Sequence, residues 1–437
     1  MTECKQGILN FPSFDGRKIE ANFGGGDVSS DGGVMLLRQA DRRLGLCEAL
    51  ARSIPERRDP AMITHRQVDL LRQRIYGIAL GYEDLNDHDS LRRDPLWQSA
   101  VERGDELASS PTLCRLEGRA DRRTAWAMSR VLVESFIGSF PLAPAELVLD
   151  FDATDDRVHG GQEGRFFHGY YGDWCFLPLY VFCGDRLLVS YLRPSNIDAS
   201  RHAPAILKLL VTRLREAWPG VKITFRGDSG FCRWKMLRWC ERHGVGYVVG
   251  LAKNPRLLGL AGELMGRAEE AHRAAGAKAR IFGWLEYAAE SWDRPRRVIA
   301  KAEHGAQGAN PRFVVSNLPG DAGEIYDAIY CARGEMENRI KEQQLGLFAD
   351  RTSCHAWWAN QFRLLLSSAA YVLLEAIRRL GLRGTELARA QVGTIRLKLL
   401  KLGTVILRNT RRIRLLFSSA YPNRELFGLV ASRLQTG

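Results

Sequence analysis

The sequence lacks any apolar run of the roughly 18 residues that a membrane-spanning helix needs, although 45% of its 437 residues are hydrophobic. It also lacks a regular cysteine pattern, because its nine cysteines stand at irregular spacing. Such usage favours reduced thiols inside a cell over a secreted disulfide framework. The N-terminus has no basic segment leading into an apolar one, so we expect no secretory signal. These absences indicate a globular chain with a full core.

Acidic residues are scarce near the C-terminus. The whole chain has a formal net charge of +13, and from Thr352 to Gly437 there are 14 Lys or Arg residues against three acidic ones. This local excess of +11 predicts a surface for nucleic acid. A solvated basic tail is the alternative, but the region is also rich in Leu, Ile and Val, so we expect it to fold.

The N-terminal third has the spacing of helices. Residues 65–80 place Val68, Leu71, Ile75 and Ile78 on one face. Ser110 is a predicted N-cap with Pro111 at the first helical position, and residues 121–140 form another amphipathic run. The stretch "PLAPAE" then breaks the pattern, which predicts a boundary near residue 144.

Beyond this boundary the pattern changes to short apolar runs. Three hairpin-like strands and then alternating helices and strands, up to residue 252, predict a mixed sheet with helices on its faces. Residues 254–325 interrupt the alternation, and their apolar runs indicate a separate antiparallel piece. Residues 334–348 and 354–380 return to helix, and residues 394–417 predict a basic hairpin around Gly403.

Two of the predicted strands end in aspartate, which strands normally avoid. Asp152 ends the run "LVLDFD", and Asp228 ends the run "ITFRGD". Functional groups gather at the carboxyl ends of strands in open sheets, and two close carboxylates repel unless a cation lies between them. Mg²⁺ suits such oxygen ligands, with Asp150 as a further ligand two residues before Asp152. A turn-forming role remains the alternative for either aspartate alone.

A third carboxylate lies on a predicted helix. Arg333, Glu337 and Lys341 are spaced four residues apart, so they share one helix face. Ordinary salt bridging on a solvated face explains this spacing equally well. The functional interpretation is a carboxylate that completes a metal site, flanked by two cations for a DNA backbone.

These residues resemble the DDE transposases of bacterial insertion sequences. Asp152-Ala153-Thr154 matches the Asp-x-Thr of the family's first strand, and "FRGDSGF" matches the end of its fourth strand. One subgroup has a Tyr-Arg-Glu-Lys signature and a β-rich insertion. Tyr330, Arg333 and Glu337 fit this signature, whereas its lysine position holds Gln344, one turn after Lys341. Stretches such as "HGGQEGRFFHGYYGDWCFLPL" extend the resemblance over most of the chain.

The resemblance implies an α/β fold, a ribonuclease H-like mixed sheet interrupted by a β-rich insertion, with a helical N-terminal region and a basic C-terminal region. The expected parts are a DNA-end-binding region at 1–144, a first part of the catalytic core at 145–253, the insertion at 254–325, a second part of the core at 326–380 and the basic region at 381–437.

The implied function is transposition by DNA cleavage and strand transfer. Asp152, Asp228 and Glu337 would hold two Mg²⁺ (or Mn²⁺) ions per site. Partners would be double-stranded DNA, as element ends and as target, and a second copy in a homodimer, with no membrane, in the bacterial cytoplasm at the nucleoid. The expected DNA-binding residues are Tyr330, Arg333, Lys341, Arg115, Arg119, Arg408, Arg411 and Arg412.

Alternatives remain open at this point. A ribonuclease H-like nuclease that cuts without joining would share the same carboxylates, and a DNA-binding descendant without catalysis would be expected to have lost one of them. Arg115 and Arg119 also fit a solvated charged helix. Trp284 and Trp292, in the insertion, could stack on a flipped base, but a core position is the commoner one for Trp.

Overall fold

The computed structural model describes residues 7–435 and forms two compact units. One unit combines residues 1–117 with residues 373–437, and the other contains residues 118–372. The compact units therefore do not divide near residue 144. The reason is that helix α7 (Arg122–Gly138) packs on a strand of the second unit. Within the described residues, no helix is long and apolar enough to cross a membrane.

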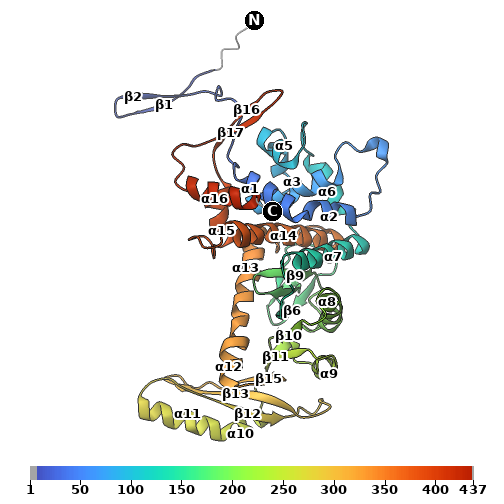
Figure 1. Cartoon of the computed structure of the whole chain (residues 1–437), viewed down its shortest axis with the longest axis vertical. Coiled ribbons are helices and arrows are strands. Elements are labelled where there is room, and N and C mark those ends of the chain that lie inside the picture. The colour runs from blue at the N-terminus through green and yellow to red at the C-terminus, as the bar shows by residue number, and fades with distance from the viewer. Residues whose placement is uncertain (1–6, 436–437) are drawn as a thin grey trace. The chain divides into compact units, whose positions relative to one another are not determined.

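The second unit is built on a nine-stranded mixed sheet (Figure 1). Its first five strands along the chain lie in the spatial order β9, β8, β4, β10, β11. β4 is parallel to β10 and β10 to β11, whereas β8 is antiparallel to both β4 and β9. This is the mixed sheet predicted from the sequence, in the ribonuclease H-like form that the resemblance implied. The strands are β4 (Glu146–Ala153), β8 (Leu179–Cys183), β9 (Arg186–Tyr191), β10 (Lys222–Gly227) and β11 (Gly246–Leu251).

The insertion at 254–325 is β-rich, as predicted, but the prediction of a separate piece is wrong. Strand β15 pairs antiparallel with β11, so β12, β13 and β15 extend the same sheet. This pairing covers an edge of β11 that would otherwise leave its backbone groups unpaired. Two helices that the sequence did not reveal pack here. The elements are α10 (Pro255–Leu260), α11 (Gly262–Ala275), β12 (Ala279–Tyr287), β13 (Arg296–Gly305), β14 (Gly308–Ala309) and β15 (Arg312–Ser316).

The two faces of the sheet have different roles. Leu147, Leu149 and Phe151 point from β4 into the main core, together with residues of α8 (Ala203–Ala217) and α9 (Trp234–Arg242). Because side chains alternate along a strand, Asp150 and Asp152 point to the opposite face. On that side lie α13 (Gly334–Leu347) and α14 (Trp357–Ala376). The chain segment between β4 and β8 forms a separate small sheet of β5 (Asp156–Arg157), β6 (Phe166–His168) and β7 (Asp173–Phe176).

The first unit is mainly helical, as the apolar spacing predicted. Its central helix α3 is almost entirely buried, including Arg72 and Arg74. Helix α6 begins at Ser110, so Ser110 is the first helical residue rather than the predicted N-cap. The helices are α1 (Val34–Leu44), α2 (Leu46–Ser53), α3 (Gln67–Leu80), α4 (Asp87–Leu91), α5 (Pro95–Val101), α6 (Ser110–Gly118), α15 (Val392–Ile395) and α16 (Arg424–Gln435).

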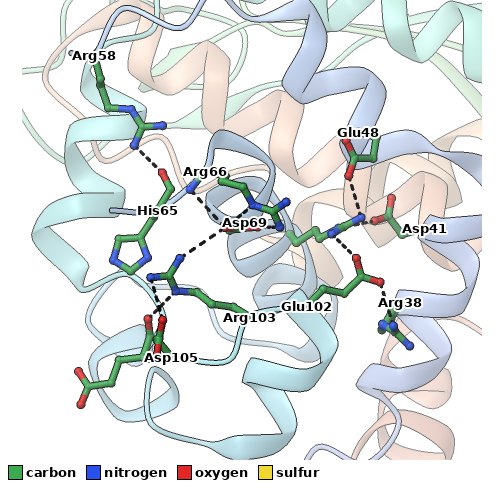
Figure 2. Close-up of polar contacts among 12 residues, drawn as sticks. Arg38, Asp41, Glu48, Arg58, His65, Arg66, Asp69, Glu102, Arg103 and Asp105 are labelled. Atoms are coloured by element: carbon green, nitrogen blue, oxygen red, sulfur yellow. Dashed lines mark hydrogen bonds and ion pairs between the residues drawn. The ribbon is translucent and has the colours of Figure 1, made fainter. Parts of the chain in front are cut away.

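Buried charges of the first unit are neutralised by a network of ion pairs. Asp41, Glu48 and Glu102 lie close together in Figure 2 and accept from the guanidinium of Arg72, whose side chain is only 5% exposed. Arg66 and Arg103 both pair with Asp69 in the same view. Pairing of this kind is what makes buried charges tolerable in a core. We assign this network to the stability of the unit.

The C-terminal segment folds together with the N-terminal helices. Strand β16 (Thr404–Arg408) pairs with β3 (Val28–Ser29) and with β17 (Ile413–Phe417). The predicted basic hairpin exists, but its turn lies at residues 409–412 and not at Gly403. The segment before Gly403 is helical instead. A second hairpin, of β1 (Leu9–Phe14) and β2 (Arg17–Ala21), is exposed along its whole length.

Candidate active site

The ends of β4 and β10 carry the two strand-end aspartates. The parallel register sets Asp150 opposite Arg226 and Phe151 opposite Gly227, so Asp152, near the end of β4, and Asp228, directly after β10, lie at the same edge of the sheet. Asp228 also caps the 3₁₀ turn η2 (Ser229–Phe231), where its Oδ1 accepts from the Gly230 amide at 2.9 Å. Turn formation and a functional role are therefore compatible for Asp228.

Glu337 enters from the first turn of α13. The chain before it forms the π-helix η3 (Ile325–Tyr330) and the 3₁₀ turn η4 (Cys331–Arg333). Such irregular helical turns are frequent at functional sites, because they set the side chains of adjacent turns at spacings that a regular helix does not offer. Tyr330 is the last residue of η3, Arg333 is the last residue of η4, and Glu337 lies in the first turn of α13.

Arg333 lies between two of the predicted carboxylates. Its Nη2 is 2.8 Å from Oε1 of Glu337, and its Nη1 is 3.7 Å from Oδ2 of Asp152. Burial raises the pKa of Asp152 to about 7; Arg333 lowers this pKa, and the charges of Asp228 and Glu337 raise it. Asp152 is thus within electrostatic reach of Asp228 and Glu337, and the Arg333 guanidinium contacts two of the three carboxylates.

Tyr330 reaches the same cluster from η3. Its hydroxyl lies over Gly250 of β11, where a Cβ on the glycine would be 2.7 Å from the phenol oxygen and 2.9 Å from the Ser229 amide nitrogen. Burial raises the pKa of Tyr330, Arg333 lowers it and the Asp228 charge raises it. The absence of a side chain at Gly250 therefore lets the phenol approach Asp228.

Asp150 has a different role from the predicted further ligand. It forms a bidentate ion pair with the buried Arg226, with 2.7 Å between its Oδ2 and Nη2. The same guanidinium donates to the Ile329 carbonyl. Because both carboxylate oxygens are engaged by Arg226, this pair holds β4, β10 and η3 together, and Asp150 serves this ion pair instead of a metal.

The donor chemistry of the cluster fits a divalent cation. Carboxylate oxygens are hard donors, which Mg²⁺ and Mn²⁺ prefer, and the charges of Asp228 and Glu337 raise the pKa of Asp152. Among the described residues, however, no three His, Cys, Asp or Glu side chains form a ready-made metal group. Arg333 supplies the neutralising positive charge in this arrangement.

The family model for the transposase DDE domain group 1 matches residues 11–437. The chain belongs to the DDE transposases. It is therefore an enzyme that acts on DNA by cleavage and strand transfer. No curated protein sequence shows significant similarity to it. A solved structure that it resembles is the cryo-EM structure of the piggyBac transposase synaptic complex with hairpin DNA, with 11% identity, a TM-score of 0.43, and coverage of 85% of this chain and 80% of that chain. This distant likeness carries no assignment.

In this transposase Lys341 is exposed, whereas Gln344 forms a hydrogen bond within the protein. Lys341 is exposed and makes no ion pair within the part of the chain that the structure describes, so Glu337 pairs with Arg333 rather than with Lys341. Gln344 donates from Nε2 to the Asp155 carbonyl at 3.0 Å. The residue at the signature's lysine position is thus engaged in fastening α13 to the turn after β4.

The arginines predicted to bind DNA lie in both units of the transposase. Arg115 is exposed on α6 and donates to Thr112 at 3.0 Å, and Arg119 follows the end of that helix in the second unit. Arg408 donates to Gln98 at 3.1 Å within the first unit. Arg411 and Arg412 are exposed in the β16–β17 turn.

Part of the C-terminal positive charge is structural. Arg396 donates to the carbonyl of Ala79 at 2.9 Å, and Lys401 pairs with the buried Asp31 at 2.8 Å. These hydrogen bonds and ion pairs join the C-terminal segment to N-terminal elements of the same unit. The excess of +11 therefore overstates the charge that is free for DNA.

Three residues near the cluster were not singled out from the sequence. Arg226 and Gly250 lie on strands whose register decides their neighbours, and no sequence signal identifies them. Tyr171 lies in the aromatic stretch between β6 and β7. Trp284 and Trp292 are partly buried and pack against apolar clusters of the second unit, which favours the packing role over an exposed stacking role.

Proposed function

We propose that this transposase belongs to the insertion-sequence subgroup with the Tyr-Arg-Glu-Lys signature, and that Asp152, Asp228 and Glu337 are its catalytic carboxylates. They would hold two divalent cations, Mg²⁺ or Mn²⁺. The observation that carries this proposal is the cluster around Arg333, in which Asp228 and Glu337 both raise the pKa of Asp152. Like charges that lie close together destabilise a fold. Such clusters are therefore found mainly at functional sites.

Bound divalent cations would supply activation of the attacking hydroxyl and stabilisation of the leaving oxygen at a phosphodiester. The chain's own residues would orient the DNA. Arg333 offers a planar fork of donors that suits phosphate oxygens, and Lys341 offers a long, exposed ammonium one turn beyond Glu337. Tyr330, half-buried near Asp228, would position that carboxylate and the end of the strand.

The other parts of the proposal concern recognition and assembly. Residues 1–144 would recognise the element ends, with Arg115 and Arg119 on phosphates, and residues 381–437 would bind DNA through Arg408, Arg411 and Arg412. The active complex would be a homodimer that holds two ends at the bacterial nucleoid. Light scattering of the protein with and without end DNA would measure the assembly.

The deciding experiment uses the full-length protein and the DNA that flanks its own gene. With Mg²⁺ we expect cuts at fixed positions on both sides, and joining of the freed 3′ ends to a target plasmid. Asp228→Asn should abolish both products while leaving binding in Ca²⁺ intact. Cuts without joining would identify a nuclease, and binding without cuts would identify an inactive descendant.

A further inference from the structure

The hairpin of β6 and β7 carries an aromatic surface that the chemistry above does not use. We call residues 165–174, "RFFHGYYGDW", the aromatic hairpin. Six of its ten residues carry a ring, and none is aliphatic. Phe167 is 55% exposed, Tyr170 86% and Trp174 45%. A soluble protein rarely leaves such rings in water unless they bind something.

The exposed rings contact one another edge to face. Phe167 and Trp174 are direct partners across the β6–β7 ladder, with ring centroids 6.2 Å apart. The Arg165 guanidinium lies 4.6 Å from the centroid of Trp174. Tyr170 is 5.0 Å from Tyr171 in an edge-on arrangement. Flat side chains therefore line the hairpin, and nucleobases stack on side chains of this kind.

The aromatic hairpin is held firmly at its base. Ser195 donates to the Phe166 carbonyl at 2.8 Å. Just before the hairpin, the Glu163 carboxylate accepts from the Trp357 amide at 3.1 Å, and a Cβ on Gly164 would be 2.5 Å from the Trp357 ring. Gly164 has a φ of +79°, a conformation that favours glycine. The rings are therefore displayed from a fixed support in the second unit.

This surface lies next to the chain segment that follows Asp152. Strand β7 pairs with β5, which begins three residues after β4 ends, and Arg157 of β5 lies 3.7 Å from Asp155 and 3.7 Å from Asp173 of the hairpin. Tyr171 lies in the turn between β6 and β7. Burial raises its pKa to about 12, and the charges of Asp155 and Asp152 raise it as well.

We propose that the aromatic hairpin binds unpaired bases of the DNA strand that is cut next to Asp152, by stacking them on Trp174, Phe167 and Tyr170. This inference rests on the proposed function, because it needs DNA at the carboxylate cluster. Bases stack on flat rings, and the hairpin has such rings and no aliphatic side chain. Arg165 would add a cation next to the stacked base.

The test compares flat with non-flat side chains at one position. The variants are Trp174→Tyr, which keeps a ring, and Trp174→Leu, which keeps only apolar character. Trp126→Leu is the matched control, since Trp126 is 53% exposed on α7, outside the hairpin. The probes are a duplex and the same duplex with a three-nucleotide unpaired tail that contains 2-aminopurine, both in Ca²⁺. Affinity and 2-aminopurine fluorescence are measured.

We expect the tail to raise the affinity of the wild-type protein about tenfold and to quench 2-aminopurine, because stacking on an aromatic side chain contributes roughly this much per base. Trp174→Leu should remove both effects and leave duplex affinity within twofold, whereas Trp174→Tyr and Trp126→Leu should keep them. If Trp174→Leu still preferred the tailed duplex, the proposal would be overturned. It would also be overturned if Trp174→Leu changed the oligomeric mass and not the tail preference, because the hairpin would then bind a protein partner. Neither result would affect Mg²⁺-dependent cleavage of the flanking DNA, which tests the proposed function separately.

Discussion

Arg333 and Glu337 form an ion pair of 2.8 Å across the first turn of α13, and the same guanidinium lies 3.7 Å from Asp152. One protein cation therefore serves two of the three carboxylates to which we assign metal binding. Arg333 and a divalent cation would compete for the same oxygens. In the DNA-bound enzyme, the guanidinium would be free to move to a phosphate.

Removal of this competitor should strengthen metal binding in the absence of DNA. We expect Arg333→Gln to raise the affinity for Mn²⁺ about two- to fivefold, the range of a partly exposed ion pair, while cleavage falls. Calorimetry or Mn²⁺ spectroscopy measures the affinity. Arg339→Gln is the matched control, because Arg339 lies on the same helix and pairs with Asp185 instead. Equal or weaker Mn²⁺ binding in Arg333→Gln would contradict the competition.

Glu337→Gln should abolish cleavage and leave end binding largely intact. The amide keeps the shape of the side chain and removes the charge that a metal ligand needs. Gel-shift assays in Ca²⁺ and cleavage assays in Mg²⁺ separate the two effects. Glu335→Gln is the control, since Glu335 is exposed in the same first turn of α13. Near wild-type cleavage by Glu337→Gln would remove Glu337 from the metal site.

The raised pKa of Asp152 predicts a pH-dependent stability. Between pH 3.8 and about 7, the folded state keeps a proton on Asp152 that the unfolded state releases. Stability therefore falls as the pH rises through this window and stays low above it. In EDTA, Asp152→Asn should melt close to the wild type at pH 4 and about 2–8 °C higher at pH 8. Parallel melting curves at both pH values would contradict the assignment.

Lys341 should act on DNA and contribute little to folding. Because its ammonium has no ion pair among the described residues, Lys341→Ala should leave the melting temperature unchanged. Cleavage or end affinity should fall about tenfold, roughly 1.4 kcal/mol. Lys222→Ala, at an exposed position at the start of β10, is the control. Cleavage and affinity both within twofold of the wild type would leave Arg333 as the main phosphate-binding residue of the helix.

The C-terminal charges should appear in the salt dependence of DNA binding. Arg411, Arg412 and Arg414 are exposed, whereas Arg408 donates to Gln98. Replacing the three exposed arginines by Gln should reduce the slope of log affinity against log salt by about three, because each arginine that neutralises a phosphate releases about one counterion. Titrations from 50 to 200 mM salt measure the slope. An unchanged slope would assign these residues to a solvated surface.

Some of these features could be read from the sequence and others could not. Asp152 and Asp228 stand out because each ends an apolar run, and this local pattern can be recognised without knowledge of the fold. The Asp150–Arg226 pair does not stand out, because the two residues are 76 apart in sequence and become neighbours only when β10 pairs in parallel with β4.

The same distinction explains the remaining errors. The strands of the insertion were visible as apolar runs, but their pairing with β11 depends on which sheet edge is free, and that is a property of the finished sheet. Charge composition marked the C-terminal region, yet it could not show that Arg396 and Lys401 bind elements of the N-terminal part. Composition counts charges and does not reveal their partners.

The contacts of the Arg226 guanidinium predict which mutations would impair transposition. It binds Asp150 and the Ile329 carbonyl at once, so one side chain fixes the two aspartate-bearing strands and the segment that leads to Glu337. A screen for transposition-defective alleles should therefore recover Arg226 and Asp150 as readily as the proposed metal ligands. Alleles that restore activity should change both residues together, since either one alone leaves a buried charge without its partner.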